Sequence, residues 1–386
     1  MSTALGVVTF EDLPQDIKFD IFARLPAVKL LLRLRRVCKS WHTLISSPSF
    51  IGAYHKRNVL MPSSSEYLFI GSAENKKCFS LFSAETYDKC LDLELPTHGV
   101  GLDFGVAGSC HGLVCISTRS YSPTSEAPIY LWNPSIRKLR RLPEGIIGLS
   151  RPIYVAFGFQ PGENDYKVVR IVREEESTSD VYQVEVYSLR LNSWRRVNSA
   201  IQFSNFFAVS MSPEGGVYCN GVIYKVVIEE PTYPICLPPK PMTVCARNCI
   251  LAFDTSTEVF RKIELPNELV HRDPNCGSLL HMQGLDNALC VSRFYSRSSL
   301  SADIWVLGKD DTWKVHHTIH LPSKAFIASP LGFTANGGVH LIRREEEGDK
   351  RYLVLYDTKC CPLKEIETTH IGNYVVAYTE SLLLLN

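Results

Sequence analysis

The chain has 386 residues, of which 45% are hydrophobic and 21% charged. This composition excludes a disordered or collagen-like protein, and the length predicts two or three domains or one large repeat architecture. Lys and Arg number 41 against 40 for Asp and Glu, a formal charge of +1, so no overall electrostatic field favours nucleic acid or an acidic membrane. We expect neither as a partner.

The first ten residues contain no Lys or Arg and no apolar core long enough for a signal peptide. No stretch approaches the roughly 20 apolar residues of a membrane span. The 13 cysteines are odd in number and often lie within apolar runs, which favours reduced, buried thiols over a disulfide framework. These features predict a cytoplasmic and/or nuclear protein.

Up to about residue 57 the apolar period is helical. The first helix should carry Leu13, Ile17, Ile21 and Leu25 on one face, since they recur every four residues. Pro14 suits its first position and Pro26 its end. Further apolar spacings predict a second helix near 28–34 and a third near 37–45, before a last turn that Ser47 caps and Pro48 begins.

So small a helical unit cannot bury all of its large apolar side chains, because small domains bury a low fraction of their surface. The remaining apolar seam is flanked by basic residues, which suits a partner that is acidic around a hydrophobic groove. The basic residues are Lys29, Arg33, Arg35, Arg36 and Lys39. The alternative is a helical cap folded onto the rest of its own chain.

From about residue 66 the apolar period is two, as in β-strands. A strand, a turn and a returning, mostly basic strand recur six times, at steps of 50 to 66 residues. The aromatic anchors of these hairpins are Phe82, Trp132, Tyr187, Phe253, Trp305 and Tyr356. Four copies keep a seven-residue register: Trp132 to Leu139, Tyr187 to Trp194, Phe253 to Phe260 and Tyr356 to Leu363.

A second hairpin turn precedes most of these hairpins, at 110–112, 161–165, 219–221, 285–287 and 335–338. Two hairpins per unit make a four-stranded sheet, and a period near 50 residues is typical of a kelch-like propeller blade. The sequence therefore predicts a six-bladed β-propeller. The C-terminal run YVVAYTESLLLLN, read as a strand pair, should complete the first blade and close the ring. An irregular pair of β-sandwiches is the alternative.

The segment FEDLPQDIKFDIFARLPAVKLLLRLRRVCKSWHTLISSPSFIGAYHKR resembles an F-box. The pieces GSCHGLVCI, LWNPSIRKLRRLP, FGFQPGENDYKVVRI, VEVYSLRLNSW and ILAFDTSTEVFRKIELP resemble the F-box-associated domain of the large plant families, the S-locus F-box-like branch included. The resemblance implies a mainly β fold with a small α domain: a three-helix F-box at 8–57 and a propeller domain at 62–386.

The family implies that the F-box docks on a Skp-type adaptor, which links it to a cullin and a ubiquitin-conjugating enzyme. The matching contact positions are Leu13, Pro14, Ile17, Ile21, Leu25, Pro26, Leu31, Val37, Cys38 and Trp41. Two positions are less usual for the family, namely Phe22 after Ile21 and the pair Arg35-Arg36. Neither removes the apolar seam.

The sequence offers no catalytic arrangement. It has no phosphate-binding glycine loop, GxSxG or HExxH. Cys245, Cys249 and the pair Cys360-Cys361 lack the second pair of ligands that a zinc site needs, and His316, His317 and His320 are more typical of a polar strand edge. We expect no catalytic residue, no metal and no cofactor.

The leading hypothesis is a receptor subunit of an SCF-type (Skp-cullin-F-box) ubiquitin ligase, whose propeller binds a protein substrate. The insertions at 117–128 and 229–241 are candidate substrate loops, and the acidic runs at 174–176 and 345–347 could select a basic substrate. The substrate residues themselves are unknown. Alternatives are a propeller lectin or enzyme, and an adaptor that does not promote degradation.

Overall fold

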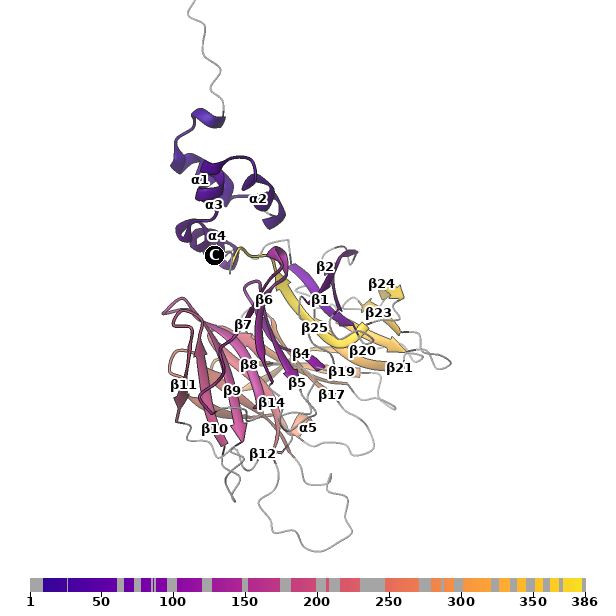
Figure 1. Ribbon diagram of the computed structural model, residues 1–386. Helices are drawn as coiled ribbons and strands as arrows, with labels where there is room; N and C mark the ends of the chain where they lie inside the picture. Colours follow the sequence, from indigo (N-terminus) through magenta and orange to yellow (C-terminus); the bar gives the residue numbers. More distant parts are fainter. Residues whose placement is uncertain are drawn as a thin grey trace, which may run out of the picture.

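The protein is described here from a computed structural model (Figure 1). The structure describes residues 10–25, 27–60, 66–72, 78–84, 86, 88–95, 103–119, 127–147, 152–173, 182–198, 206–207, 216–229, 247–270, 279–285, 288–294, 301–320, 326–333, 339–344, 351–356, 362–367 and 371–383. Within these ranges, none of the helices has both the length and the apolar character needed to cross a membrane.

The N-terminal region forms a short 3-10 helix and four α-helices. They are η1 (Phe10–Asp12), α1 (Gln15–Ala23), α2 (Val28–Leu34), α3 (Lys39–Ile45) and α4 (Pro48–Leu60). Pro14 lies at the N-cap of α1, one residue before the predicted place. The predicted cap at Ser47 is confirmed, because its Oγ accepts the N–H of Phe50 at 3.2 Å. The last turn expected there continues as α4, which has 13 residues.

These helices share one hydrophobic core. Aromatic rings dominate its outer part: Trp41 packs edge-on against Phe22 at 5.1 Å and against Phe10 at 5.2 Å. The ring of Phe50, on α4, packs edge-on against that of Phe19, on α1, with 5.1 Å between the ring centroids. The buried members of the core are Phe22, Val28, Leu31, Leu44, Ile45, Phe50, Tyr54 and, from the far end of the chain, Leu382.

In the described residues the strands form six antiparallel sheets. The first blade combines β25 (Ile371–Thr379), β1 (Glu66–Ser72), β2 (Cys78–Ser83) and β3 (Lys89–Glu94). The second contains β4 (Asp103–Cys110), β5 (Leu113–Arg119), β6 (Ile129–Asn133) and β7 (Lys138–Arg141), with η2 (Pro134–Ile136) between the last two. The third contains β8 (Pro152–Gln160), β9 (Asp165–Arg173), β10 (Tyr182–Ser188) and β11 (Ser193–Val197).

The other three blades follow the same plan. The fourth contains β12 (Phe206–Phe207), β13 (Val217–Cys219), β14 (Val222–Glu229), β15 (Arg247–Asp254) and β16 (Phe260–Glu264), followed by α5 (Asn267–Val270). The fifth contains β17 (Leu279–Leu285), β18 (Ala288–Phe294), β19 (Ser301–Leu307) and β20 (Trp313–His320). The sixth contains β21 (Phe326–Phe333), β22 (Val339–Arg344), β23 (Arg351–Tyr356) and β24 (Pro362–Glu367).

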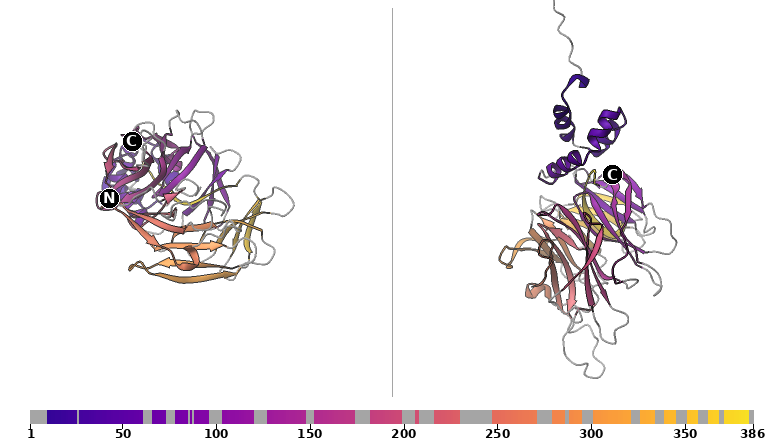
Figure 2. Two further views of the ribbon diagram at one scale, coloured as in Figure 1. Left: turned by 90° about the horizontal axis from the view of Figure 1, so that it is seen from below. Right: turned by 60° about the vertical axis from the view of Figure 1, so that its left-hand side comes forward.

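The innermost strands make the sheets into a closed ring. In order round the ring, β25, β4, β8, β13, β17 and β21 each contact the next, and β21 contacts β25 again. Figure 2 shows the sheets from below and from a second side. The predicted propeller is therefore confirmed, and so is its closure by the C-terminus, since β25 pairs with β1. The C-terminal run supplies one strand of that blade, however, where a strand pair was expected.

Three of the four seven-residue registers are direct cross-strand pairs: Trp132 with Leu139, Tyr187 with Trp194, and Phe253 with Phe260. Tyr356 instead faces Pro362, because the register shifts by one residue beside it. Cross-strand pairs of large apolar side chains stabilise a sheet, which explains why the repeat preserves them.

Two inner hairpins turn in two residues that both have positive φ. They are His111 (φ 48°) with Gly112 (φ 82°), and Asn220 (φ 48°) with Gly221 (φ 83°). This is the pattern of a type I′ turn, whose twist matches that of the strands and whose second position favours glycine. Of the predicted turn at 285–287 only Leu285, the last residue of β17, is described, and the predicted turn at 335–338 lies outside the described residues.

The direction of the strands shows which loops lie at the end of the propeller next to the helices and which lie at the opposite end. The β4–β5 turn, at His111, and the end of β8, at Phe159, both contact His55 of α4. Strand β5 therefore runs away from the helices, and its antiparallel partner β6 returns towards them. In the fourth blade β14 likewise runs away from the helices and β15 returns. The strand ends that bracket 120–128 and 230–246 lie at the end of the propeller opposite the helices.

Candidate partner-binding surface on the helical domain

Helix α1 has apolar side chains on two faces. Phe19 and Phe22 point into the helical core, whereas Ile17 and Ile21 are 42% and 38% exposed. The two isoleucines are four residues apart and so share one face of the helix. Figure 1 shows α4 next to the propeller and α1 further from it. The propeller therefore leaves this face of α1 uncovered, contrary to the reading of the helices as a cap on their own chain.

The other predicted contact residues divide by exposure. Pro14, Cys38 and Val37 are exposed, the last by 62%, and Leu13, Leu25 and Trp41 are half-buried. Leu31 is fully buried in the helical core. In the free chain it therefore packs beneath the exposed contact residues and is not itself accessible to a partner. Pro26 lies outside the described residues.

Helices α2 and α3 supply a positive rim. From Val28 to Ile45 the sequence has five Lys or Arg residues and no Asp or Glu. Four of them, Lys29, Arg33, Arg36 and Lys39, are exposed. A chain of overall charge +1 thus has a locally positive segment that contains the exposed Val37, which favours a partner with negative charge around an apolar groove.

The helices rest on the propeller through a neutral aromatic contact. His55 of α4 is 8% exposed, its ring lies 5.2 Å from that of His111, and its Nε2 is 3.3 Å from the hydroxyl of Tyr166. Burial lowers the pKa of His55 to about 4, and burial with the neighbouring His55 lowers that of His111 to about 4. Both rings are therefore neutral at neutral pH, so this part of the junction carries no charge.

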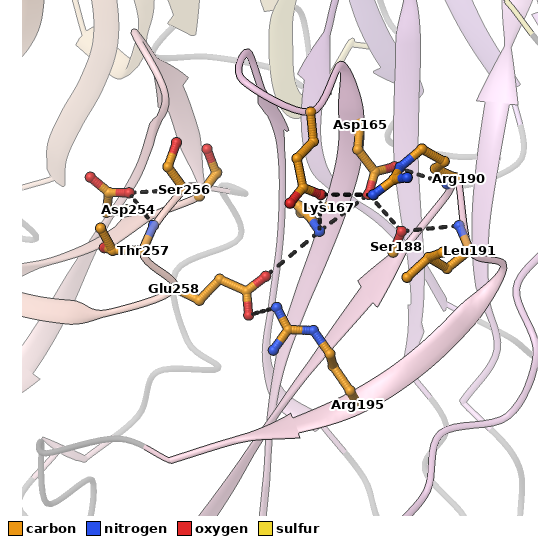
Figure 3. A network of polar contacts seen from close by, with 12 residues as sticks. Asp165, Lys167, Ser188, Arg190, Leu191, Arg195, Asp254, Ser256, Thr257 and Glu258 are labelled. Carbon is orange, nitrogen blue, oxygen red and sulfur yellow. Dashed lines mark hydrogen bonds and ion pairs between the residues drawn. The ribbon is translucent and has the colours of Figure 1, made fainter.

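A second group of polar side chains gathers where the third and fourth blades meet (Figure 3). The buried Nζ of Lys167 lies 3.2 Å from Asp165 and 3.6 Å from Glu258, which also pairs with Arg195. Asp165 further accepts the hydroxyl of Ser188 at 2.6 Å.

Each of the two buried carboxylates thus faces a cation. Because Glu258 belongs to the turn of the fourth blade and the other members to the third, the network fastens neighbouring blades together and leaves no group poised as an acid, base or nucleophile. Asp165, Lys167, Ser188 and Glu258 all lie in pieces that resemble the F-box-associated domain, but spacing alone gave no sign that these side chains pair.

Other chemistry-bearing residues give no site in the part of the chain that the structure describes, where no group of three or more metal-ligating side chains occurs. Cys249 is buried without a disulfide, and His316 is exposed on β20. The central part of the first candidate substrate loop, at 120–126, nearly all of the second, at 230–241, and the acidic runs at 174–176 and 345–347 lie outside the described residues.

Comparison with known families gives two matches. Residues 64–382 match the family described as "F-box associated beta propeller domain", and residues 10–51 match "F-box-like". Among curated proteins of Arabidopsis thaliana, F-box protein CPR1 is 31% identical over 328 residues, covering 80% of this chain and 73% of the relative. F-box/kelch-repeat protein At3g23880 is 28% identical over 310 residues, covering 77% and 75%.

Among solved structures, TolB from Acinetobacter baumannii aligns with a TM-score of 0.42 at 10% identity, covering 85% of this chain and 70% of that one.

Proposed function

Because the chain belongs to the plant F-box proteins with an F-box-associated β-propeller domain, we propose that it is the substrate receptor of an SCF-type ubiquitin ligase. The helical domain docks on a Skp-type adaptor, and the propeller binds a protein that is thereby ubiquitinated and degraded. The chain itself contributes no catalytic group and acts in the cytoplasm, the nucleus or both.

The observation that carries this proposal is the uncovered surface of the helical domain. Ile17 and Ile21 on α1 and Val37 before α3 are all exposed, and Val37 lies within the basic segment from Lys29 to Lys39. Exposed apolar side chains together with a positively charged segment are typical of a surface that a partner completes. An adaptor with acidic residues around an apolar groove matches both features.

The opposite end of the propeller is the proposed place for the substrate. The strands that bracket 120–126 and 230–246 end there, at Arg119, Ile129, Glu229 and Arg247. Variable loops on a rigid sheet scaffold can change specificity without disturbing the core. A substrate bound at this end would not compete with an adaptor bound at the helices.

The proposed role needs no bond chemistry in this chain. Holding an acceptor lysine near an activated ubiquitin raises the effective concentration of the two reactants, which is catalysis by proximity. The receptor's contribution is then the fixed geometry between its two binding surfaces. The neutral junction at His55 and the closed ring of blades both favour such a fixed geometry.

A proximity-labelling or pull-down screen tests the proposal. It compares the wild type with the double variant Leu13→Ala, Pro14→Ala, which shortens side chains at the start of α1. We expect the variant to lose the Skp-type adaptor while it keeps the substrate. Retention of the adaptor would contradict the docking assignment, and an adaptor-bound wild type that fails to support ubiquitination in a reconstituted assay would indicate a non-degradative adaptor.

A further inference from the structure

The last described residues of the chain leave the propeller and enter the helical domain. After β25 ends at Thr379, the side chain of Leu382 is 1% exposed and belongs to the hydrophobic core of the helices. The next residue, Leu383, packs against the core of the second and third blades. Two successive leucines thus join the two domains, and in Figure 1 the yellow chain that follows β25 runs towards α4.

The same segment completes the start of α2. The N-cap of this helix is Ala27, which makes no side-chain capping hydrogen bond. The N–H of Val28 instead donates to the carboxylate of Glu380 at 3.0 Å, across 352 residues of sequence. An uncapped helix terminus leaves N–H groups without partners, and a carboxylate there is favoured by the helix dipole.

The propeller holds the segment from its other side. Asn133, which is fully buried, donates through Nδ2 to the carbonyl of Ser381 at 3.0 Å and to that of Leu383 at 2.8 Å. Gly112 must lack a side chain here, because a Cβ would lie 2.5 Å from Ser381. The motifs CHG and NPS of the second blade therefore hold residues 381–383 against the propeller.

We propose that Glu380–Leu383 is a clasp through which closure of the propeller completes the fold of the partner-binding helices. The clasp reaches the helices only when β25 has paired with β1, since β25 immediately precedes it. A chain whose ring is open would lack both the cap of α2 and one side chain of the helical core. Only a chain whose propeller ring is closed would then have helices that are fully folded for binding the partner.

The proposal rests on the proposed function only where adaptor binding is the readout. The primary test is therefore hydrogen–deuterium exchange of the free, full-length chain, without any adaptor. Leu382→Ala is compared with Leu191→Ala, an identical substitution at a side chain that is 59% exposed in a propeller turn.

We expect the amides of α2 and α4 to lose protection by at least ~30-fold in Leu382→Ala, the lower end for a buried leucine cut to alanine. Those of β5 and β9 should keep theirs, and Leu191→Ala should match the wild type throughout. Unchanged protection of α2 and α4 in Leu382→Ala would overturn the clasp.

A second variant guards against global unfolding. Glu380→Ala leaves Leu382 in place and removes only the cap of α2, so its loss of protection should be confined to the first turn of α2, at roughly fivefold. Loss spread evenly over the whole chain in both variants would contradict a local clasp.

Adaptor binding is the last readout. If the clasp and the docking are both right, Leu382→Ala binds a purified Skp-type adaptor about tenfold more weakly than Leu191→Ala does. If the wild type itself binds no adaptor while the exchange results hold, the proposed function fails and the clasp stands.

Discussion

Replacing Ile17 and Ile21 together by alanine should weaken adaptor binding without unfolding the chain. Full burial of such a side chain contributes about 1.5–3 kcal/mol. Since the two side chains are 42% and 38% exposed, about two fifths of this remains to be gained on docking, roughly 1 to 2.5 kcal/mol for the pair. At tenfold per 1.4 kcal/mol, Kd should rise roughly 5- to 60-fold.

Isothermal titration calorimetry with a purified Skp-type adaptor measures this change. The matched control is Ile146→Ala, since that side chain is 53% exposed on the propeller and should leave Kd unchanged. The thermal midpoints of both variants should stay within a few degrees of the wild type, because the inward face of α1 is intact. An unchanged Kd in the double variant would refute the assignment of the α1 face to the partner.

Four further substitutions probe the scaffold. Asn133→Asp should destabilise the chain by about 3 kcal/mol, because a carboxylate would face the carbonyls that the amide now serves; thermal unfolding measures it. Lys167→Met should cost about 3 kcal/mol in denaturant unfolding, since it leaves two buried carboxylates with weaker compensation, whereas Arg190→Ala at the exposed edge of the network should cost less than about 1 kcal/mol. Burial lowers the pKa of His55 from 6.5 to about 4, so between these values the unfolded chain binds a proton that the folded chain does not, and stability falls as the pH falls through this window. His55→Gln should reduce the loss of unfolding free energy between pH 7 and pH 4.5 by about 2 kcal/mol.

Much of the fold follows from local patterns. A blade contains its own hairpins, so the aromatic residue of one strand and its partner lie seven positions apart in Trp132 and Leu139 as in Tyr187 and Trp194. Two-residue turns at 111–112 and 220–221 are equally local, because glycine is needed where φ is positive. Such signals repeat, and the number of blades follows from counting them.

The contacts that join distant parts of the chain could not be predicted from such local patterns. Glu380 and Leu382 lie in a C-terminal run that the sequence predicts to be a strand pair, and nothing near them in sequence indicates that they complete helices more than 300 residues away. The outward and inward faces of the helices were also hard to separate, since Leu31 and Val37 are both apolar but only the second is exposed. Burial depends on the tertiary neighbours, which periodicity within one helix does not identify.

The most direct test of the account is the footprint of a Skp-type adaptor on the full-length chain, measured by amide exchange with and without it. We predict that protection increases in α1 and in the segment between α2 and α3, around Ile21 and Val37, and stays constant in all six blades. Protection that arises only in the propeller, or no complex at all, would contradict the claim that the helical domain presents an unfinished surface to a partner.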